Sequence, residues 1–196
     1  MGRSLKFCLK ISAFCLASYL ASYLASGVAF ASSSPPDFSR SDIISGPATV
    51  LDGDTLQIGD KKIILFGVDA PENGQLCQIY DKSWPCGERA KIWLTRYVGD
   101  GPVRCLPREG DPFDDRIGGI KAMCFNTKTW NLSATMLTAG LAVANLEDGD
   151  WFKLGNVAAR VNRKGVWAGK FVPPHQWRAG IRLPVRRSTK DRGLQP

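Results

Sequence analysis

The sequence predicts an α+β domain in which short β-strands curl into a small barrel and helices fill the gaps between them. Three observations carry this prediction. Apolar runs of strand length follow one another early in the chain, separated by turn residues. Amphipathic helical patterns appear only after them. Residues 32–196 have the length of one domain with a real core, and they contain no internal repeat that would indicate a second domain.

Residues 1–31 read as an export signal rather than as part of the fold. They begin with three basic residues, continue as an uncharged apolar stretch at 11–30, and end in the small-residue cleavage site Ala29-Phe30-Ala31. We therefore expect cleavage before Ser32, a periplasmic or secreted protein, and no stable membrane association afterwards. The alternative is an uncleaved anchor, because about 20 apolar residues span a bilayer. Residues 32–45 then form a flexible lead-in, of which the first ten are rich in Ser and Pro.

Strands are expected at 43–50, 55–58 and 62–68, because turn chemistry separates these apolar runs. Two more are expected at 103–106 and 120–125, on either side of a polar excursion. Early strands that curl together, with helices between the later ones, are typical of an OB-type barrel.

Three helices are expected. The first, at 87–97, is amphipathic and ends at Gly99; the second is capped by Asn131 or Ser133 and stopped by Gly140; the third covers 152–163. Residues 73–86 are predicted to be a loop held by its cysteines, and 141–146 an extended run. From Arg178 the chain is basic and contains proline, so we expect it to pack poorly, with 179–196 as a basic tail.

Four cysteines remain after the signal, and an even number in an exported chain indicates two disulfides. Four cysteines allow three pairings. We favour Cys77 with Cys86, which closes one loop, and Cys105 with Cys124, whose flanks look like neighbouring strands. Zinc is the weaker reading, because the chain has no C-x-x-C pair and a single histidine far from the cysteines.

Charge and aromatic content permit a nucleic-acid partner without requiring one. The chain after the signal has 23 basic and 18 acidic residues, a net charge of +5. Such an excess favours polyanions, but it also serves solubility alone. Six tryptophans are expected mostly to fill the core and the gaps between helices and barrel, with a base-stacking platform as the alternative.

Acidic residues stand at the ends of two predicted strands. Asp52 and Asp54 flank a turn glycine, Asp69 follows the third strand, and Glu72 comes behind Pro71. Barrel curvature could bring them together, and hard oxygen ligands suit Ca²⁺ or Mg²⁺. A separate carboxylate beside the ion could take a proton from an attacking water. By spacing alone the turn reading is the better one, since Asp and Gly are common in turns.

Two segments resemble the signatures of the staphylococcal nuclease (thermonuclease) family: Val50-Leu51-Asp52-Gly53-Asp54-Thr55 and Gly67-Val68-Asp69-Ala70-Pro71-Glu72. Together with Asp115-Arg116-Ile117-Gly118 and Gly165-Val166-Trp167, the resemblance covers roughly 46–178, the expected nuclease-like domain. It implies a five-stranded OB barrel with three helices, and Ca²⁺-dependent cleavage of DNA and RNA, with Mg²⁺ as the alternative ion.

The resemblance also implies roles for individual residues. Asp54, Asp69 and the backbone carbonyl of Ala70 would hold the cation, and Glu72 would be the general base. Asp52 would support the turn beside these ligands. The ion would polarise the phosphate and neutralise developing charge.

The chain departs from the family pattern at both arginine positions, which are Ile64 and Gly119 here. Fixed positive charge at a reacting phosphate contributes much of the rate in such chemistry, so turnover is expected to be weak. Lys62 and Lys121 lie two residues away on the same predicted strand faces and are possible phosphate contacts. A lysine, however, is a point charge rather than a fork.

Two functions are therefore carried forward. The first is an exported metal-dependent nuclease, a monomer that hydrolyses DNA or RNA phosphodiesters weakly. The second is a catalytically degenerate binding domain for nucleic acid or for an envelope polysaccharide, since OB barrels bind both. Glu72 favours the first, because a binding module has no need of a base.

Overall fold

The computed structural model describes residues 42–108, 113–114, 118–128 and 130–184. The predicted signal, most of the lead-in, the tail beyond residue 184 and Asp115-Arg116-Ile117 of the third family motif lie outside these residues. Within them, no helix is long and apolar enough to cross a membrane.

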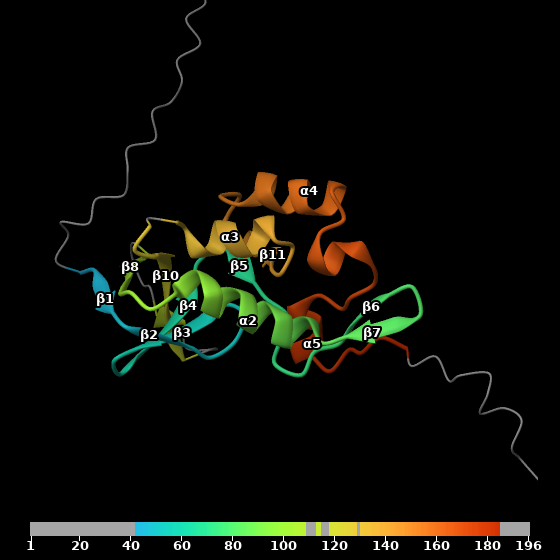
Figure 1. The fold of residues 1–196 in the computed structure, drawn as a ribbon, viewed down its shortest axis with the longest axis horizontal. Helices are drawn as coiled ribbons and strands as arrows, with labels where there is room; N and C mark the ends of the chain where they lie inside the picture. The colour runs from blue at the N-terminus through green and yellow to red at the C-terminus, as the bar shows by residue number, and fades with distance from the viewer. Residues whose placement is uncertain (1–41, 109–112, 115–117, 129, 185–196) are drawn as a thin grey trace, which may run out of the picture. The chain divides into compact units, whose positions relative to one another are not determined.

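The first part of the domain is a series of short strands, of which the second, third and fourth pair in sequence order (Figure 1). They are β1 (Ile44–Gly46), β2 (Ala48–Val50), β3 (Thr55–Ile58), β4 (Lys61–Leu65) and β5 (Val68–Asp69). The first predicted strand is thus divided at Pro47, which has no N–H for a sheet ladder. The third is divided by the turn at Phe66-Gly67.

The sheet nearly closes into a barrel. Its strand order is β1-β8-β10-β4-β3-β2, with β8 at Val103–Pro107 and β10 at Gly119–Phe125, and the two-residue β9 (Phe113–Asp114) pairs with β10. β10 runs parallel to β4, and the other neighbours are antiparallel. Since β1 and β2 occupy opposite edges but are joined through Pro47, one bent segment links both edges. Counting that segment once gives the predicted five-stranded OB-type barrel, in an α+β domain.

The described residues contain the three predicted helices, the first two against the barrel and the third against the second, and a short fourth follows them. α2 (Cys86–Val98) ends at Gly99, and α3 (Leu132–Thr138) is capped by the Asn131 side chain, which accepts from the Ala134 N–H. α4 (Lys153–Val161) lies along the outer side of α3 (Figure 1). Single turns of 3₁₀ helix occur at Leu146–Asp148 (η1) and Gly165–Ala168 (η2), and α5 is Pro174–Arg178.

Two regions differ from the prediction. The segment expected to be a loop at 73–86 contains a hairpin, β6 (Cys77–Ile79) with β7 (Lys82–Trp84). The expected extended run at 141–146 is reduced to β11 (Val143–Ala144), which pairs with β5. The partner of β11 lies more than 70 residues away in sequence, and the strands of the hairpin are only three residues long, so local alternation revealed neither pairing.

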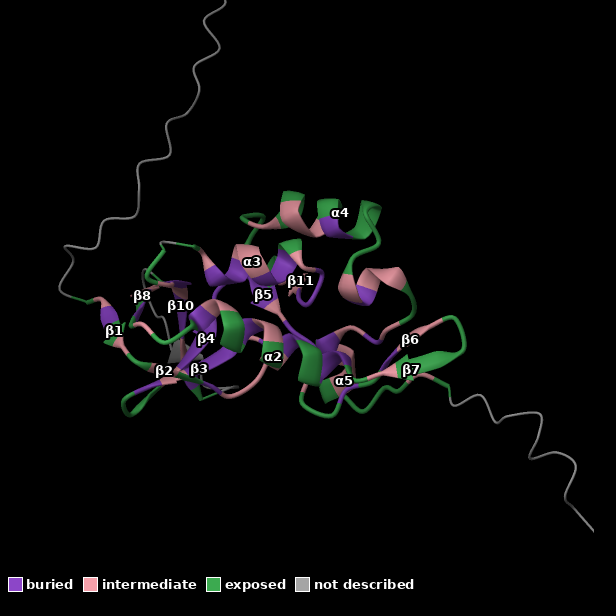
Figure 2. Ribbon diagram, viewed as in Figure 1, coloured by how far each residue is buried: buried purple, intermediate pink, exposed green. Residues whose placement is uncertain are grey.

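Both disulfides connect the pairs that the sequence favoured. Cys77 is bonded to Cys86, and Cys105 to Cys124 across β8 and β10. All four cysteines are fully buried. The main core lies inside the barrel and under the inner faces of α2 and α3, where buried residues gather in Figure 2. The largest fully buried apolar side chains include Leu56, Ile63, Leu65, Leu94, Leu132, Met136 and Leu137.

Candidate active site

The turn between β2 and β3 holds two of the predicted acids in place. The Asp54 N–H donates to Asp52 Oδ1 at 3.1 Å, so Asp52 supports the turn, the role the resemblance implied. Asp54 in turn accepts from the Thr55 hydroxyl at 2.9 Å and from the Ala70 N–H at 2.7 Å. The second of these bonds ties the first acidic turn directly to the strand end that carries Asp69.

Glu72 is held by the start of α2. A Cβ at Gly87 would lie 1.8 Å from the Glu72 carbonyl oxygen, so the helix packs against this backbone only because residue 87 is glycine. The Glu72 N–H donates to Gln75 Oε1 at 3.0 Å, and the Gln75 N–H donates back to the Glu72 carbonyl at 2.8 Å. Gln75 is completely buried, which fixes the turn that presents Glu72.

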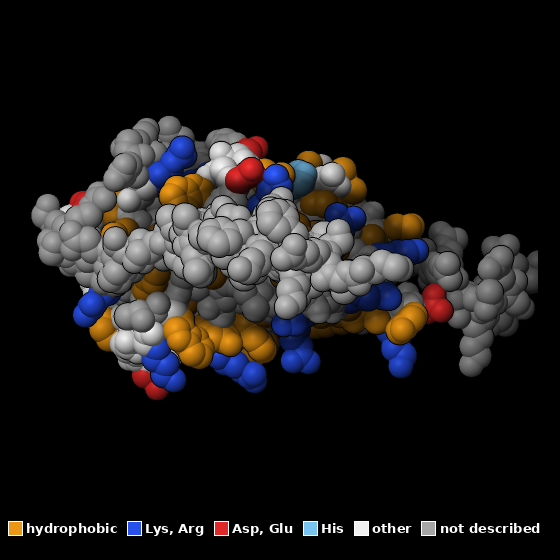
Figure 3. Space-filling model, turned by 90° about the horizontal axis from the view of Figure 1, so that it is seen from above, with side chains coloured by type: hydrophobic (Ala, Val, Ile, Leu, Met, Phe, Trp, Pro, Cys, Tyr) orange, Lys and Arg blue, Asp and Glu red, His pale blue; other side chains and the backbone are white. Residues whose placement is uncertain are grey.

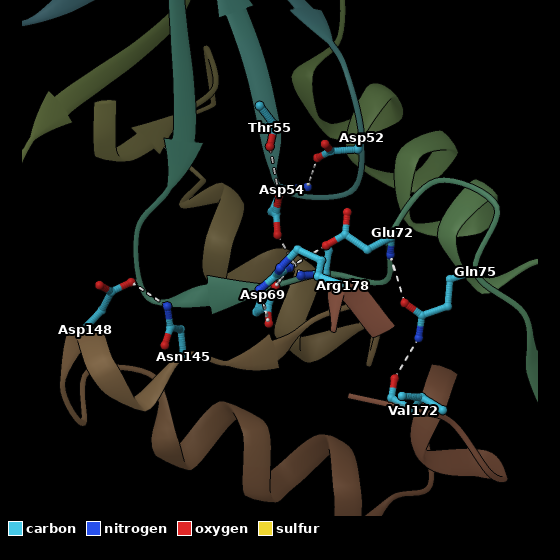
Figure 4. A network of polar contacts seen from close by, with 11 residues as sticks. Asp52, Asp54, Thr55, Asp69, Glu72, Gln75, Asn145, Asp148, Val172 and Arg178 are labelled. Atoms are coloured by element: carbon cyan, nitrogen blue, oxygen red, sulfur yellow. Dashed lines mark hydrogen bonds and ion pairs between the residues drawn. The ribbon is translucent and has the colours of Figure 1, made fainter. Parts of the chain in front are cut away.

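These four carboxylates line one cavity of about 180 Å³, which we call the acidic cavity. Figure 4 shows Asp52, Asp54, Asp69 and Glu72 in one region, with Arg178 in contact with Asp69 and Glu72. The remaining lining residues are Thr55, Lys62, Ile64, Val68, Lys121, Asn145, Asp148 and Arg178. Tertiary structure therefore brings the predicted acids and both predicted lysines to one place.

Burial and mutual repulsion act on the acids. Burial, and then the neighbouring Asp52, raise the pKa of Asp54 well above its ordinary value. Burial also raises the pKa of Glu72, although the Arg178 guanidinium opposes that shift. A carboxyl with a raised pKa beside further carboxylates is the environment expected of a general base or a cation ligand.

The donor set fits a hard cation in its chemistry, since carboxylate oxygens and the Ala70 carbonyl are the ligands that Ca²⁺ and Mg²⁺ prefer. Within the described parts of the chain, no three Asp, Glu, His or Cys side chains are gathered closely enough to form a finished metal centre. The convergence of Asp54, Asp69 and Glu72 on one ion stays a prediction, and so does the choice of ion.

The two lysines have different surroundings. Lys121 is buried, and its ammonium pairs with Asp148 Oδ1 at 2.8 Å. Asp148 is also buried, and its other oxygen accepts from the Gly67 N–H at 3.1 Å and from the Asn145 amide at 3.2 Å. Lys62 is half-buried on β4 and faces the same cavity. Lys121 therefore lines the cavity while its ammonium is paired with the buried Asp148 carboxylate.

Apolar contact replaces charge at the two expected arginine positions. Ile64 is almost fully buried and lines the acidic cavity. A Cβ at Gly119 would lie 3.0 Å from the Ile64 Cδ1 atom and 3.1 Å from the Lys62 carbonyl oxygen. The two positions are neighbours, so the small residue at 119 accommodates the branched one at 64.

Arg178 lines the acidic cavity, which the sequence analysis did not predict. It was expected to begin a poorly packed tail; instead it ends α5 and forms ion pairs with both Asp69 and Glu72. The only signal in the sequence is the preceding Pro173-Pro174 and Trp177, which mark a short helix start with an apolar anchor. That signal predicts packing but not a partner.

The described tryptophans differ in burial, and their use as a base-stacking platform stays a prediction. Trp84, Trp93 and Trp167 are half-buried against the core, and their indole N–H groups have no partner among the described residues. Trp130 is half exposed and contacts Tyr97, which contacts Trp93, as a ladder of tilted rings with centroids 5.6 Å apart in both cases. This ladder lines a hollow of about 990 Å³ between α2 and α3, together with Arg89, Arg96 and Lys164.

An OB-type barrel with an acidic cavity beside β3, β4 and β5 defines a nuclease-like protein. Residues 62–169 match the family model described as staphylococcal nuclease homologue. The chain belongs to the staphylococcal nuclease family, as its two acidic signatures predicted.

Two characterised relatives differ in what their names report. The Succinoglycan biosynthesis protein ExoI of Rhizobium meliloti (strain 1021) is 26% identical over 148 residues, which is 74% of each chain. The Probable endonuclease LCL3 of Candida dubliniensis (strain CD36) is 31% identical over 114 residues, covering 54% of this chain and 47% of the relative. The chain thus spans about half the length of the second protein. Family and relatives together support a nuclease-like function.

Proposed function

We propose that this protein is an exported, metal-dependent phosphodiesterase that hydrolyses DNA or RNA. The observation that carries the proposal is the gathering of Asp52, Asp54, Asp69 and Glu72 around one small cavity whose wall also contains lysine and arginine. Phosphodiester hydrolysis requires a base for the attacking water and positive charge for the phosphate, and these residues supply both kinds of group.

Glu72 has the properties of the base. Burial raises its pKa from an ordinary value of 4.5, so it holds a proton more tightly than a solvated carboxylate does. Gln75 and the start of α2 fix its backbone, so the carboxylate is aimed into the cavity (Figure 4). A bound Ca²⁺ or Mg²⁺ at Asp54, Asp69 and the Ala70 carbonyl would polarise the phosphate and neutralise charge as it develops.

The surface suits a polyanion that carries planar groups. Lys and Arg side chains project along one edge of the molecule with hydrophobic side chains between them (Figure 3). The Trp93, Tyr97 and Trp130 ladder beside Arg89 and Arg96 offers stacking for bases and charge for phosphates. These features support single-stranded nucleic acid as the substrate class.

The test is cleavage of single-stranded DNA and RNA by the mature protein with Ca²⁺, with Mg²⁺, and with a chelator. Glu72→Gln should lower kcat by a factor of about 10² to 10⁴, the usual contribution of a positioned base, and should leave Ca²⁺ binding measurable by calorimetry. Glu88→Gln removes the same charge from an exposed position in the first turn of α2 and serves as the control. Equal loss in both variants would remove Glu72 from the reaction.

A second candidate is a binding domain that has lost turnover, and the Ile64–Gly119 contact favours it, because an apolar contact stands where charge is needed. The relative named for succinoglycan biosynthesis extends this candidate to an envelope polysaccharide. The double variant Ile64→Arg with Gly119→Arg separates the two functions. It should raise cleavage if the cavity is a working site, whereas an inactive wild type with no gain and no cation binding would favour the binding domain.

A further inference from the structure

Arg178 lines the acidic cavity, although it belongs to the last described helix of the chain. Its Nη1 lies 2.7 Å from Asp69 Oδ1, and its Nη2 lies 3.2 Å from Asp69 Oδ2, which is a two-pronged contact. Nη1 also donates to Glu72 Oε1. The three side chains meet at the centre of Figure 4, and the contacts join residues separated by more than 100 positions in the chain.

Buried contacts fix the segment that delivers this side chain. The Gln75 amide donates to the Val172 carbonyl at 2.7 Å, and Val172 and Pro174 are buried. Just before them, Lys170 and Gln78 exchange two backbone hydrogen bonds of 2.8 Å. α5 therefore starts from an anchored point, and its last residue is directed at the cavity. The same Gln75 side chain holds the Glu72 turn, so one buried amide positions both Glu72 and the arginine segment.

The Arg178 guanidinium is partly exposed and has N–H donors left for a further ligand. Its side chain is 47% exposed, whereas those of Asp69 and Glu72 are 13% and 28% exposed. Arginine carries five N–H donors in a planar fork, and the three contacts above use two from Nη1 and one from Nη2, which leaves two for a further oxygen. The cavity wall also includes the apolar Ile64, beside Gly119. Arg178 thus places a fixed cation in a cavity that lacks both of the arginines expected from the family pattern.

We propose that Arg178 is the phosphate-binding residue of this site, contacting a non-bridging oxygen of the scissile phosphate in place of the arginines absent at positions 64 and 119. This proposal rests on the phosphodiesterase function proposed above. A guanidinium fork matches the geometry of phosphate oxygens, and its ion pairs with Asp69 and Glu72 orient it before substrate arrives. Positive charge held in position stabilises the negative charge that collects on the phosphate during reaction.

The same contacts also fit the opposite role, in which Arg178 slows cleavage instead of promoting it. A guanidinium between Asp69 and Glu72 occupies space that a divalent cation would use, so Arg178 could obstruct the site. Loss of the side chain would then raise cleavage instead of lowering it. Cation affinity does not separate the two roles, because removing a positive charge from between two carboxylates tightens cation binding in both. Binding of the nucleic acid does separate them.

The decisive experiment compares Arg178→Ala, Arg178→Lys and Arg182→Ala. Arg182 belongs to the same segment and carries the same charge, but it stacks on Trp177 with its guanidinium 3.5 Å from the ring centroid and does not line the acidic cavity. For the binding measurement, each variant is combined with Glu72→Gln, which slows cleavage. Fluorescence anisotropy then follows binding of a labelled single-stranded DNA decamer in the presence of Ca²⁺. In the otherwise unchanged protein, kcat/KM is measured on the same strand.

We expect Arg178→Ala to weaken decamer binding about tenfold or more and to lower kcat/KM by a factor of about 10² to 10³, the cost of losing one group that stabilises transition-state charge. Arg178→Lys should recover part of both, because it retains the charge but not the fork. Arg182→Ala should retain both. Thermal unfolding checks that each variant is folded; should the alanine variant unfold, the lysine variant carries the comparison.

Three outcomes would overturn the proposal. Cleavage that is unchanged in Arg178→Ala would leave the phosphodiesterase function intact and remove Arg178 from it. Cleavage that increases, with decamer binding retained, would identify Arg178 as an obstruction. A wild-type protein that neither cleaves nor binds the decamer would overturn the function itself, together with this role.

Discussion

Replacing Gln75 by leucine is the most informative single change outside the acidic cavity. Gln75 is completely buried, and its side chain bridges the turn that presents Glu72 and the segment that presents Arg178. Leucine has a similar size but no polar atoms. The variant therefore tests whether one buried amide coordinates two parts of the site that are almost 100 residues apart in sequence.

The magnitude follows from the two bonds that are lost, one of 3.0 Å from the Glu72 N–H and one of 2.7 Å to the Val172 carbonyl. Each group left without a partner costs about 1 to 3 kcal/mol, and the added apolar surface of leucine offsets part of that. We expect the free energy of unfolding to fall by about 3 kcal/mol. Because α5 would no longer be fixed, kcat/KM should also fall, on the order of tenfold.

Urea denaturation gives the stability change from the midpoint at constant slope, and cleavage assays give kcat/KM. Gln57→Leu is the matched control: its amide makes one exposed bond of 2.9 Å to the Gly59 carbonyl, and its loss should cost less than about 0.5 kcal/mol. A Gln75→Leu protein as stable and active as this control would refute the bridging role. A loss of stability with full activity would show that Gln75 supports the core and not the site.

Two other measurements concern charges near the cavity. Asp148→Asn removes the carboxylate that pairs with the buried Lys121 ammonium, and urea denaturation should show a loss of about 3 to 5 kcal/mol in the free energy of unfolding. Adding Lys121→Met should restore more than half of that loss. A double variant no more stable than the single variant would contradict this account of the pair. The raised pKa of Glu72 means that, without divalent cations, the folded state binds its proton more tightly than the unfolded state. The free energy of unfolding of wild type, relative to that of Glu72→Gln, should therefore be highest below about pH 4.5. It should decrease as the pH rises through the pKa that Glu72 has in the folded protein. If this difference between the two proteins does not change with pH, the burial of the carboxylate is contradicted.

The sequence predicted the local structure well wherever a signal lay within one segment. Asn131 and Gly99 set the ends of two helices because capping depends on the residue itself and its near neighbours. The acidic turns were found for the same reason. The hairpin between Cys77 and Cys86 was missed because its strands are only three residues long and lack clear alternation.

The sequence by itself determined the family, the barrel and the acids that line the cavity, since each of these leaves a pattern in contiguous residues, whereas it only favoured one of three disulfide pairings. Tertiary structure alone decided which charges accompany those acids. Lys121 meets Asp148, and Arg178 meets Asp69 and Glu72, across separations of 27, 109 and 106 residues. A single lysine or arginine looks the same in sequence whether it lies in solvent or in an ion pair, because its partner is set by how the chain packs.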